Sequence, residues 1–209
     1  MEIRKGTLKV PQIFDNIEKQ LLTALKEAMG LSYRSDFCVG YFNLRGWKKI
    51  DRLVEQWPGG EGHCCRLLVG MQQLPQEQLR QLMGINSNSD EIDQATAIAL
   101  KRKLAQEFRD QLMVGIPTNE DEEGLRRLAA QITTGKVSVK LYLRHPLHAK
   151  LYLLFRQDSI NPKIAYLGSS NLTFAGLSKQ GELNVDILDH DACDKLAKWF
   201  EDRWDDRFC

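Results

Sequence analysis

Three short segments late in the sequence carry polar residues whose types and spacing suit chemistry on phosphate. They are His148-Ala149-Lys150, Gly168-Ser169-Ser170-Asn171 and Glu182-Leu183-Asn184. The polar residues within each segment are two positions apart, so on an extended strand they share one face and lie about 7 Å from each other. If the three segments belong to neighbouring strands, that face presents imidazole, ammonium, hydroxyl, amide and carboxylate groups together.

Each of these groups has a task in the cleavage of a phosphodiester. A neutral imidazole such as His148 can attack phosphorus and form a covalent phosphohistidine, which splits one difficult step into two. A carboxylate such as Glu182 fixes the other ring nitrogen. Lys150 and Asn171 can donate to the equatorial oxygens on which negative charge develops, and Ser169 adds a donor. Because the positive charge comes from side chains, this chemistry requires no metal and no cofactor.

The segments resemble the signature of the phospholipase D superfamily, which reads His-x-Lys-x4-Asp-x6-Gly-Ser-x-Asn with a Glu further along. The resemblance is specific over residues 144–189, and the order of strands and helices in the whole chain fits one half of the family's fold. It implies an α/β fold with a mixed central β-sheet flanked by helices. The roles that it implies are His148 as nucleophile, Lys150 and Asn171 as phosphate ligands, Ser169 as an auxiliary donor and Glu182 as partner of the histidine.

The sequence departs from this signature at two points. Phe155 occupies the position of the signature Asp, and Asp158 lies nearby but out of phase. The stretch from Lys150 to Gly168 is also longer than in the signature, which predicts an extended hairpin turn over 156–163. Some nuclease branches of the family are similar in lacking the Asp, so its loss favours a nuclease over a lipase. Whether the domain cleaves or only binds is left open by this departure.

Further residues are candidates for binding the substrate. The strand over 38–42 and the following Asn43-Leu44-Arg45-Gly46-Trp47 look like the opening of family members fused to helicases or restriction enzymes. Tyr41 and Arg45 would then line the substrate groove; alternatively, Tyr41 is a core residue and Arg45 a surface residue at a helix start. Together with the motif serines and the basic strand segment, the candidate substrate-binding residues are Tyr41, Arg45, Arg144, Ser169 and Ser170.

Charges are balanced over the whole chain and uneven along it. Lys and Arg number 29 and Asp and Glu number 28, so bulk charge gives no argument for a nucleic-acid partner. Residues 136–163 hold six basic residues against one acid, whereas residues 182–209 hold nine acids against four bases. The basic segment is therefore the only candidate footprint for a phosphate polymer that the sequence shows.

Hydrophobic periodicity predicts the elements that position these groups. Strands over 35–42 and 65–70 enclose a helix, which favours a parallel pair joined by a crossover. Residues 75–134 are expected to form a helical insertion or cover, and 136–189 the motif-bearing strands, within one domain over 1–209. The other predicted elements are a helix over 11–29, a helix over 47–57, strands over 137–143, 148–155, 164–169 and 183–188, and a last helix with Cys193, Phe200 and Trp204 on its apolar side.

Composition and cysteine usage indicate a soluble globular protein. Hydrophobic residues make up 43% and charged residues 27% of the chain. The sequence contains no run of about 18 apolar residues that predicts a membrane span, and its start lacks the apolar core of a signal peptide, so we expect a cytoplasmic protein. Five scattered cysteines in a reducing compartment are expected to be buried thiols. The cluster His63-Cys64-Cys65 lacks the second ligand pair of a zinc site, so no metal is expected.

Three functions are compatible with these observations. The first is a metal-independent phosphodiesterase that cleaves nucleic acid, DNA foremost. The second is a DNA-binding module of a longer helicase or restriction protein, with an effector domain C-terminal to this chain and little or no cleavage. The third is a phospholipase-type hydrolase, against which the lack of an amphipathic anchor counts. The family chemistry looks as if it uses two histidines and the chain has one His-x-Lys, so we expect a homodimer that shares the site.

Overall fold

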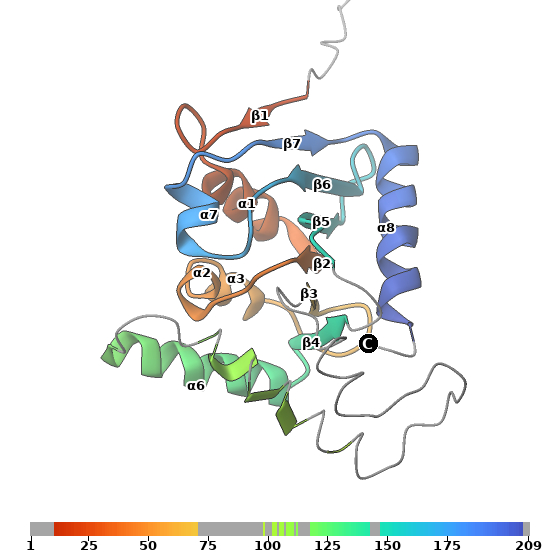
Figure 1. Cartoon of the computed structure of the whole chain (residues 1–209). Helices are drawn as coiled ribbons and strands as arrows, with labels where there is room; N and C mark the ends of the chain where they lie inside the picture. The colour runs from red at the N-terminus through yellow and green to blue at the C-terminus, as the bar shows by residue number, and fades with distance from the viewer. Residues whose placement is uncertain are drawn as a thin grey trace, which may run out of the picture.

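The computed structural model describes residues 11–70, 118–142 and 147–206, together with isolated helical positions between 98 and 112. The described strands form one seven-stranded sheet with the order β1-β7-β6-β5-β2-β3-β4 (Figure 1). Their bounds are β1 (Ile13–Phe14), β2 (Ser32–Val39), β3 (Cys65–Gly70), β4 (Val137–Tyr142), β5 (Leu151–Arg156), β6 (Lys163–Gly168) and β7 (Asn184–Ile187).

Helices cover both faces of this sheet (Figure 1). One face carries α1 (Leu21–Gly30), α2 (Leu44–Trp47), α3 (Asp51–Val54), α6 (Asn119–Thr133) and α7 (Phe174–Ser178), and the other carries α8 (His190–Trp204). Among the described helices, none is long and apolar enough to cross a membrane.

The sheet contains both parallel and antiparallel pairs, which confirms the predicted mixed α/β architecture. Strands β2, β3 and β4 run parallel, with Leu67 of β3 between Phe37 of β2 and Val139 of β4. Strands β5, β6 and β7 are antiparallel neighbours, and β5 also pairs antiparallel with β2. A parallel pair needs a crossover connection, and α2 and α3 lie between β2 and β3 as predicted.

The central strand β5 is apolar on both of its sides because each side meets a helical layer. Tyr152 and Leu154 pack into the core under α1, α2 and α7, whereas Leu151 and Leu153 pack into the core under α8. A strand buried on both faces is typically a continuous apolar run instead of an alternating one. The motif segments therefore adjoin strands that are fixed by burial on both faces.

The predicted helix over 11–29 is wrong in its first half. Residues 13–14 form β1, which pairs antiparallel with β7 at one edge of the sheet. The chain then turns at Asp15, whose carboxylate accepts hydrogen bonds from the next backbone N–H groups, and Asn16 adopts a left-handed φ of 64°. Such side-chain bonds compete with helical ones, so the helix begins only at Leu21.

Several other boundaries differ from the predicted ones. The helix predicted over 47–57 is broken at Ile50, whose φ of −128° lies outside the helical range. The segment 148–150 lies just before β5 and not within a strand, while the turn over 157–162 agrees with the predicted hairpin. The helices predicted between 75 and 114 lie almost entirely outside the described residues.

The cysteines that the structure describes are buried thiols outside any disulfide, as predicted. They are Cys38, Cys64, Cys65 and Cys193, while Cys209 lies outside the described residues. Burial raises the pKa of the thiols of Cys64, Cys65 and Cys193. These thiols are therefore packing groups in the fold and poor nucleophiles at neutral pH.

Candidate active site

The three motif segments meet at one end of the strands, where β2 and β6 end and β5 and β7 begin. His148-Ala149-Lys150 leads into β5, and the N–H of Gly168 at the end of β6 donates to the carbonyl oxygen of Lys150 at 3.2 Å. On the other side of β6, Gly168 is opposite Asn184, so Glu182 comes shortly before β7. The sheet thus places the three segments in neighbouring positions.

Gly40, just after β2, packs against two of these segments. A Cβ atom built on Gly40 would lie 3.5 Å from Oδ1 of Asn171 and 3.5 Å from Cα of His148. The backbone N–H of Tyr41 donates to the same Asn171 oxygen at 2.9 Å. This bond orients the amide, so Nδ2 of Asn171 is the end that can donate to a ligand. The sequence signal for Gly40 is a glycine at the end of an apolar strand, which is typical of a close backbone approach.

Ser169 holds the carboxylate of Glu182. Its hydroxyl donates to Glu182 Oε2 and accepts from the N–H of Leu183 at 2.9 Å, and its own N–H donates to the Leu183 carbonyl at 3.1 Å. The sequence predicts that Glu182 fixes a ring nitrogen of His148. In the structure Glu182 bonds Ser169 instead, and the exposed imidazole of His148 makes no hydrogen bond to a described residue.

Ser170 is fully buried, with 0% of its surface exposed. Its N–H donates to Oδ1 of Asn184 at 3.2 Å, and its hydroxyl accepts from Nδ2 of Asn184 at 2.8 Å. Its carbonyl accepts from the Tyr152 hydroxyl at 2.9 Å. Burial, with the charge of Glu182 nearby, raises the pKa of Tyr152, so this hydroxyl stays protonated. The structure therefore places Ser170 between β6 and β7 as a packing residue, with no exposed surface that faces a substrate.

Lys150 folds back over its own segment. Its Nζ donates to the carbonyl oxygen of His148 at 2.6 Å, which places the ammonium beside the histidine backbone. Lys150 is half-buried and His148 is exposed. Arg144, the remaining candidate for substrate binding, lies outside the described residues.

The basic segment over 136–163 is largely neutralised by local partners. The ammonium of Lys140 lies 4.8 Å from the centre of the Trp204 ring and donates to the Trp204 carbonyl. Three other basic residues of the segment form ion pairs with carboxylates: Lys136 with Glu55, Arg156 with Asp158 and Lys163 with Asp194. In its described part, the segment therefore offers fewer uncompensated charges to a phosphate polymer than its sequence predicts.

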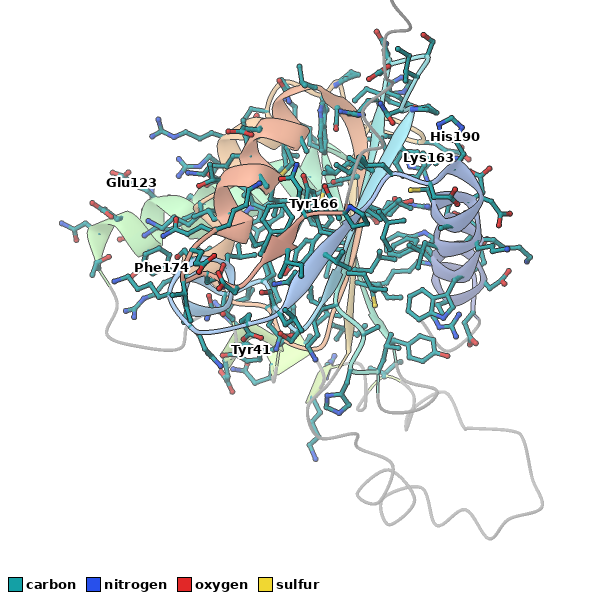
Figure 2. All side chains as sticks on the ribbon, turned by 90° about the horizontal axis from the view of Figure 1, so that it is seen from above. Tyr41, Glu123, Lys163, Tyr166, Phe174 and His190 are labelled. Carbon is teal, nitrogen blue, oxygen red and sulfur yellow. The ribbon has the colours of Figure 1, made fainter. Side chains whose placement is uncertain are left out.

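A groove of about 440 Å³ adjoins the motif residues. Asn171 and Glu182 line it, together with the predicted substrate-binding residues Tyr41 and Arg45. Phe174, at the start of α7, forms another part of its wall, and Figure 2 shows Tyr41 and Phe174 on one side of the molecule. Tyr41 is partly exposed and so is not a fully buried core residue. The groove thus lies between the motif residues Asn171 and Glu182 and the segment over 41–45.

A larger cavity of about 880 Å³ is lined by α1, by β6 and by the turn over 157–162. Charged side chains in its lining hold the fold together. Asp186 accepts from the backbone N–H of Gln12 at 2.6 Å, and Arg156 donates to the carbonyl of Asn161 at 2.7 Å. None of the predicted site residues that the structure describes lines this cavity, so its size does not make it the candidate site.

Comparisons with known proteins identify the same fold. The family described as "Cardiolipin synthase, PLD-like domain" matches residues 21–204. Among solved structures, Nuc from Salmonella typhimurium, a phospholipase D family member, superposes with a TM-score of 0.51 at 12% identity, covering 93% of each chain.

Two further solved structures are similar over most of this chain. Phosphatidylserine synthase from Haemophilus influenzae gives a TM-score of 0.50 at 16% identity, covering 92% of this chain and 37% of that one. NucT from Helicobacter pylori gives 0.49 at 10% identity, covering 93% and 95%. No curated protein sequence matches the chain.

Proposed function

The chain belongs to the phospholipase D superfamily, and we propose that it cleaves phosphodiester bonds of nucleic acid, DNA foremost, through a covalent intermediate on His148. The observation that carries the proposal is that the three motif segments lie together at one end of the strands β2, β5, β6 and β7. There Gly40 contacts both the backbone of His148 and the amide of Asn171. An exposed imidazole, a nearby ammonium and an oriented amide donor are the groups that a phosphodiester transition state requires.

The proposed reaction has two steps. In the first, a neutral ring nitrogen of His148 attacks phosphorus; the N–P bond forms while the P–O bond to one nucleoside breaks, and the leaving oxygen takes up a proton. In the second, water attacks phosphorus, the N–P bond breaks, and the water's proton returns to the group that protonated the leaving oxygen. Lys150 and Nδ2 of Asn171 donate to the non-bridging oxygens in both steps. No metal takes part in this scheme.

Ser169 and Glu182 support the histidine in this proposal. The hydroxyl of Ser169 fixes the carboxylate at the edge of the site. The exposed ring of His148 turns onto Glu182 when a phosphate binds, because exposed side chains change rotamer readily and catalytic hydrogen bonds often tighten only with substrate. The carboxylate then stabilises the imidazolium character that develops.

The proton for the leaving oxygen comes, in this proposal, from a second copy of the chain. A two-fold axis through the site places the same residue of each protomer on opposite sides of one phosphate. His148 of one protomer then attacks phosphorus, and His148 of the partner subunit acts as the general acid. A homodimer therefore completes a site for which each chain supplies one His-x-Lys.

A second candidate function is DNA binding without cleavage, within a longer helicase or restriction protein. Two observations favour it: the His148 ring makes no hydrogen bond to Glu182, and the signature Asp is replaced by Phe155. Phe155 is buried at the far end of β5, under the guanidinium of Arg34 at 4.3 Å from the ring centre. Lipid phosphodiesters are a weaker candidate, because a tyrosine and an arginine beside the site suit bases and phosphates.

The test incubates labelled single- and double-stranded DNA with wild-type protein and with His148→Ala, each in excess EDTA. We expect cleavage by the wild type that the variant loses. Binding by both proteins with cleavage by neither would support the binding module instead. A requirement for added divalent metal, with His148→Ala still active, would exclude the proposed mechanism.

A further inference from the structure

Beside the groove lies a cluster of three residues, Lys49, Phe174 and Lys179, that the family signature does not include. Nζ of Lys49 lies 4.5 Å from the centre of the Phe174 ring, and Nζ of Lys179 lies 5.0 Å from it. The same ring lines the groove that Asn171 and Glu182 also line. Two ammonium groups are thus gathered around one ring next to the candidate phosphate ligands.

Neither Lys49 nor Lys179 forms an ion pair within the part of the chain that the structure describes. The neighbouring Lys48 differs, since its ammonium pairs with Asp121 at 2.8 Å and holds α6 in place. Each ammonium group is attracted to the Phe174 ring, but the ring carries no net charge and so leaves both positive charges uncompensated. A bound anion would compensate this charge, and Arg45 lines the same groove as Phe174.

The groove also contains an aromatic side chain that the core does not use. Tyr41 is partly exposed, packs against no other described ring, and has no hydrogen-bond partner for its hydroxyl within the described residues. Its backbone is nevertheless fixed by the bond to Asn171 at 2.9 Å. A fixed aromatic residue next to cationic side chains is typical of proteins that stack the bases of single-stranded nucleic acid.

We propose that this groove binds one nucleotide of a single strand next to the phosphate that is cleaved. Tyr41 stacks on the base, the ammonium groups of Lys49 and Lys179 bind the flanking phosphate, and Phe174 is a positioning residue that holds them. The inference rests on the proposed function for the class of substrate and adds that the substrate is single-stranded. A base within a duplex has both faces covered by its neighbours, so it cannot stack on Tyr41 without leaving the duplex.

The first experiment measures binding of a short fluorescent single strand by anisotropy over a range of salt concentrations. For the double variant Lys49→Glu with Lys179→Glu we expect at least tenfold weaker binding. The slope of log affinity against log salt should also fall by about 0.7, since the two ammonium groups bind one phosphate and each neutralised phosphate of a single strand contributes about 0.7. The matched control reverses two exposed lysines on α8, Lys195→Glu with Lys198→Glu, and should retain the wild-type affinity and slope.

Equal losses in both double variants would show that only net charge matters and would overturn the subsite. If the charge reversal prevents folding, Lys49→Gln with Lys179→Gln is expected to give the same reduction in slope. An unchanged slope in that folded variant would likewise overturn it.

The second experiment compares single strand with matching duplex for Tyr41→Leu. This substitution keeps the backbone bond to Asn171 and removes the aromatic face. We expect roughly tenfold weaker binding of the single strand, as for loss of one stacked base, and little change for the duplex. Equal loss on both substrates would overturn the assignment to single strands.

These binding measurements separate the subsite from the proposed catalysis. If the wild type shows the expected binding but cleaves no DNA in EDTA, the proposed hydrolysis fails and the subsite stands. If the wild type cleaves DNA while the variant of Lys49 and Lys179 binds with wild-type affinity and slope, the subsite fails and the proposed hydrolysis stands.

Discussion

At the residue scale, two adjacent serines have different tasks. Ser169 is exposed and its hydroxyl bonds the carboxylate of Glu182, whereas Ser170 is buried and bonds the side chain of Asn184. Alternation along the strand end sends one hydroxyl to the site and the other into the core. The same mutation at the two positions should therefore affect different properties.

We expect Ser169→Ala to lower kcat about tenfold or more, because Glu182 loses the donor that fixes it, and to change stability little. Ser170→Ala should instead lower the free energy of unfolding by about 1–3 kcal/mol, because a buried amide group of Asn184 loses its partner, with kcat close to wild type. Steady-state cleavage and urea denaturation measure the two effects. The reverse pattern would show that the roles of the two serines are misassigned.

The charge-stabilising donors are the next residues to test. Lys150→Ala and Asn171→Ala are each expected to slow the chemical step by about two to four orders of magnitude, as the loss of a preorganised donor does. Lys163→Ala is the matched control, because this lysine pairs with Asp194 at the other end of the motif strands. Single-turnover cleavage measures the step directly. A wild-type rate in either site variant would place the site elsewhere.

At the scale of elements, the site depends on a close approach between α2 and the segment after β6. The N–H of Leu172 donates to the Tyr41 carbonyl at 3.2 Å, and the N–H of Asn43 donates to the Leu172 carbonyl at 3.2 Å. A Cβ atom on Gly46 would lie only 2.4 Å from that same carbonyl oxygen. Backbone atoms on both sides leave no room there, so glycine is required for steric reasons.

Gly46→Ala should therefore push α2 away from the Asn171 segment. We expect a loss of about 1–3 kcal/mol in the free energy of unfolding, the usual cost of overpacking, together with reduced cleavage. Gly30→Ala is the matched control, since a Cβ at the end of α1 meets nothing within 4 Å. It should leave stability unchanged or slightly raised, because alanine is the better helix former. Equal stability of the two variants in urea would contradict the packing described for Gly46.

Patterns that are local in sequence predicted the elements that burial fixes. The apolar run in β5 and the strand-helix-strand order before it predicted a mixed sheet. The two-residue spacing within the motifs predicted a shared face on extended strands, but residues 148–150 precede β5 and residues 169–171 follow β6. Strand β1 was missed because its position depends on pairing with β7, at the far end of the sequence. The broken helix at Ile50 was missed because apolar periodicity does not show where the backbone leaves helical geometry.

The sequence did not predict which charged side chains stay unpaired on the surface. A sequence window finds the basic segment over 136–163, but the fold pairs several of its cations with carboxylates from elsewhere in the chain. Conversely, Lys49 and Lys179 are far apart in sequence, and both lie beside the Phe174 ring because α2 and α7 are neighbours. Exposed charge at the groove is therefore a property of tertiary structure.

At the scale of the whole molecule, the proposed mechanism requires two chains. We expect a dimer at micromolar concentration in sedimentation velocity. Mixing His148→Ala with wild-type protein should lower activity by more than simple dilution, because a mixed dimer has only one of the two imidazoles. A monomer that cleaves at the full rate would refute the shared site.

The central claim is that His148 carries the phosphoryl group during the reaction. The most direct measurement reacts the protein with DNA in EDTA, quenches within the first turnover in alkali, where phosphohistidine is stable, and locates the adduct by mass spectrometry of its peptides. We expect a nucleotide or phosphate adduct on the peptide that contains His148, absent from His148→Ala. Cleavage that proceeds in EDTA with no adduct on His148 at any time in the first turnover would contradict the covalent mechanism.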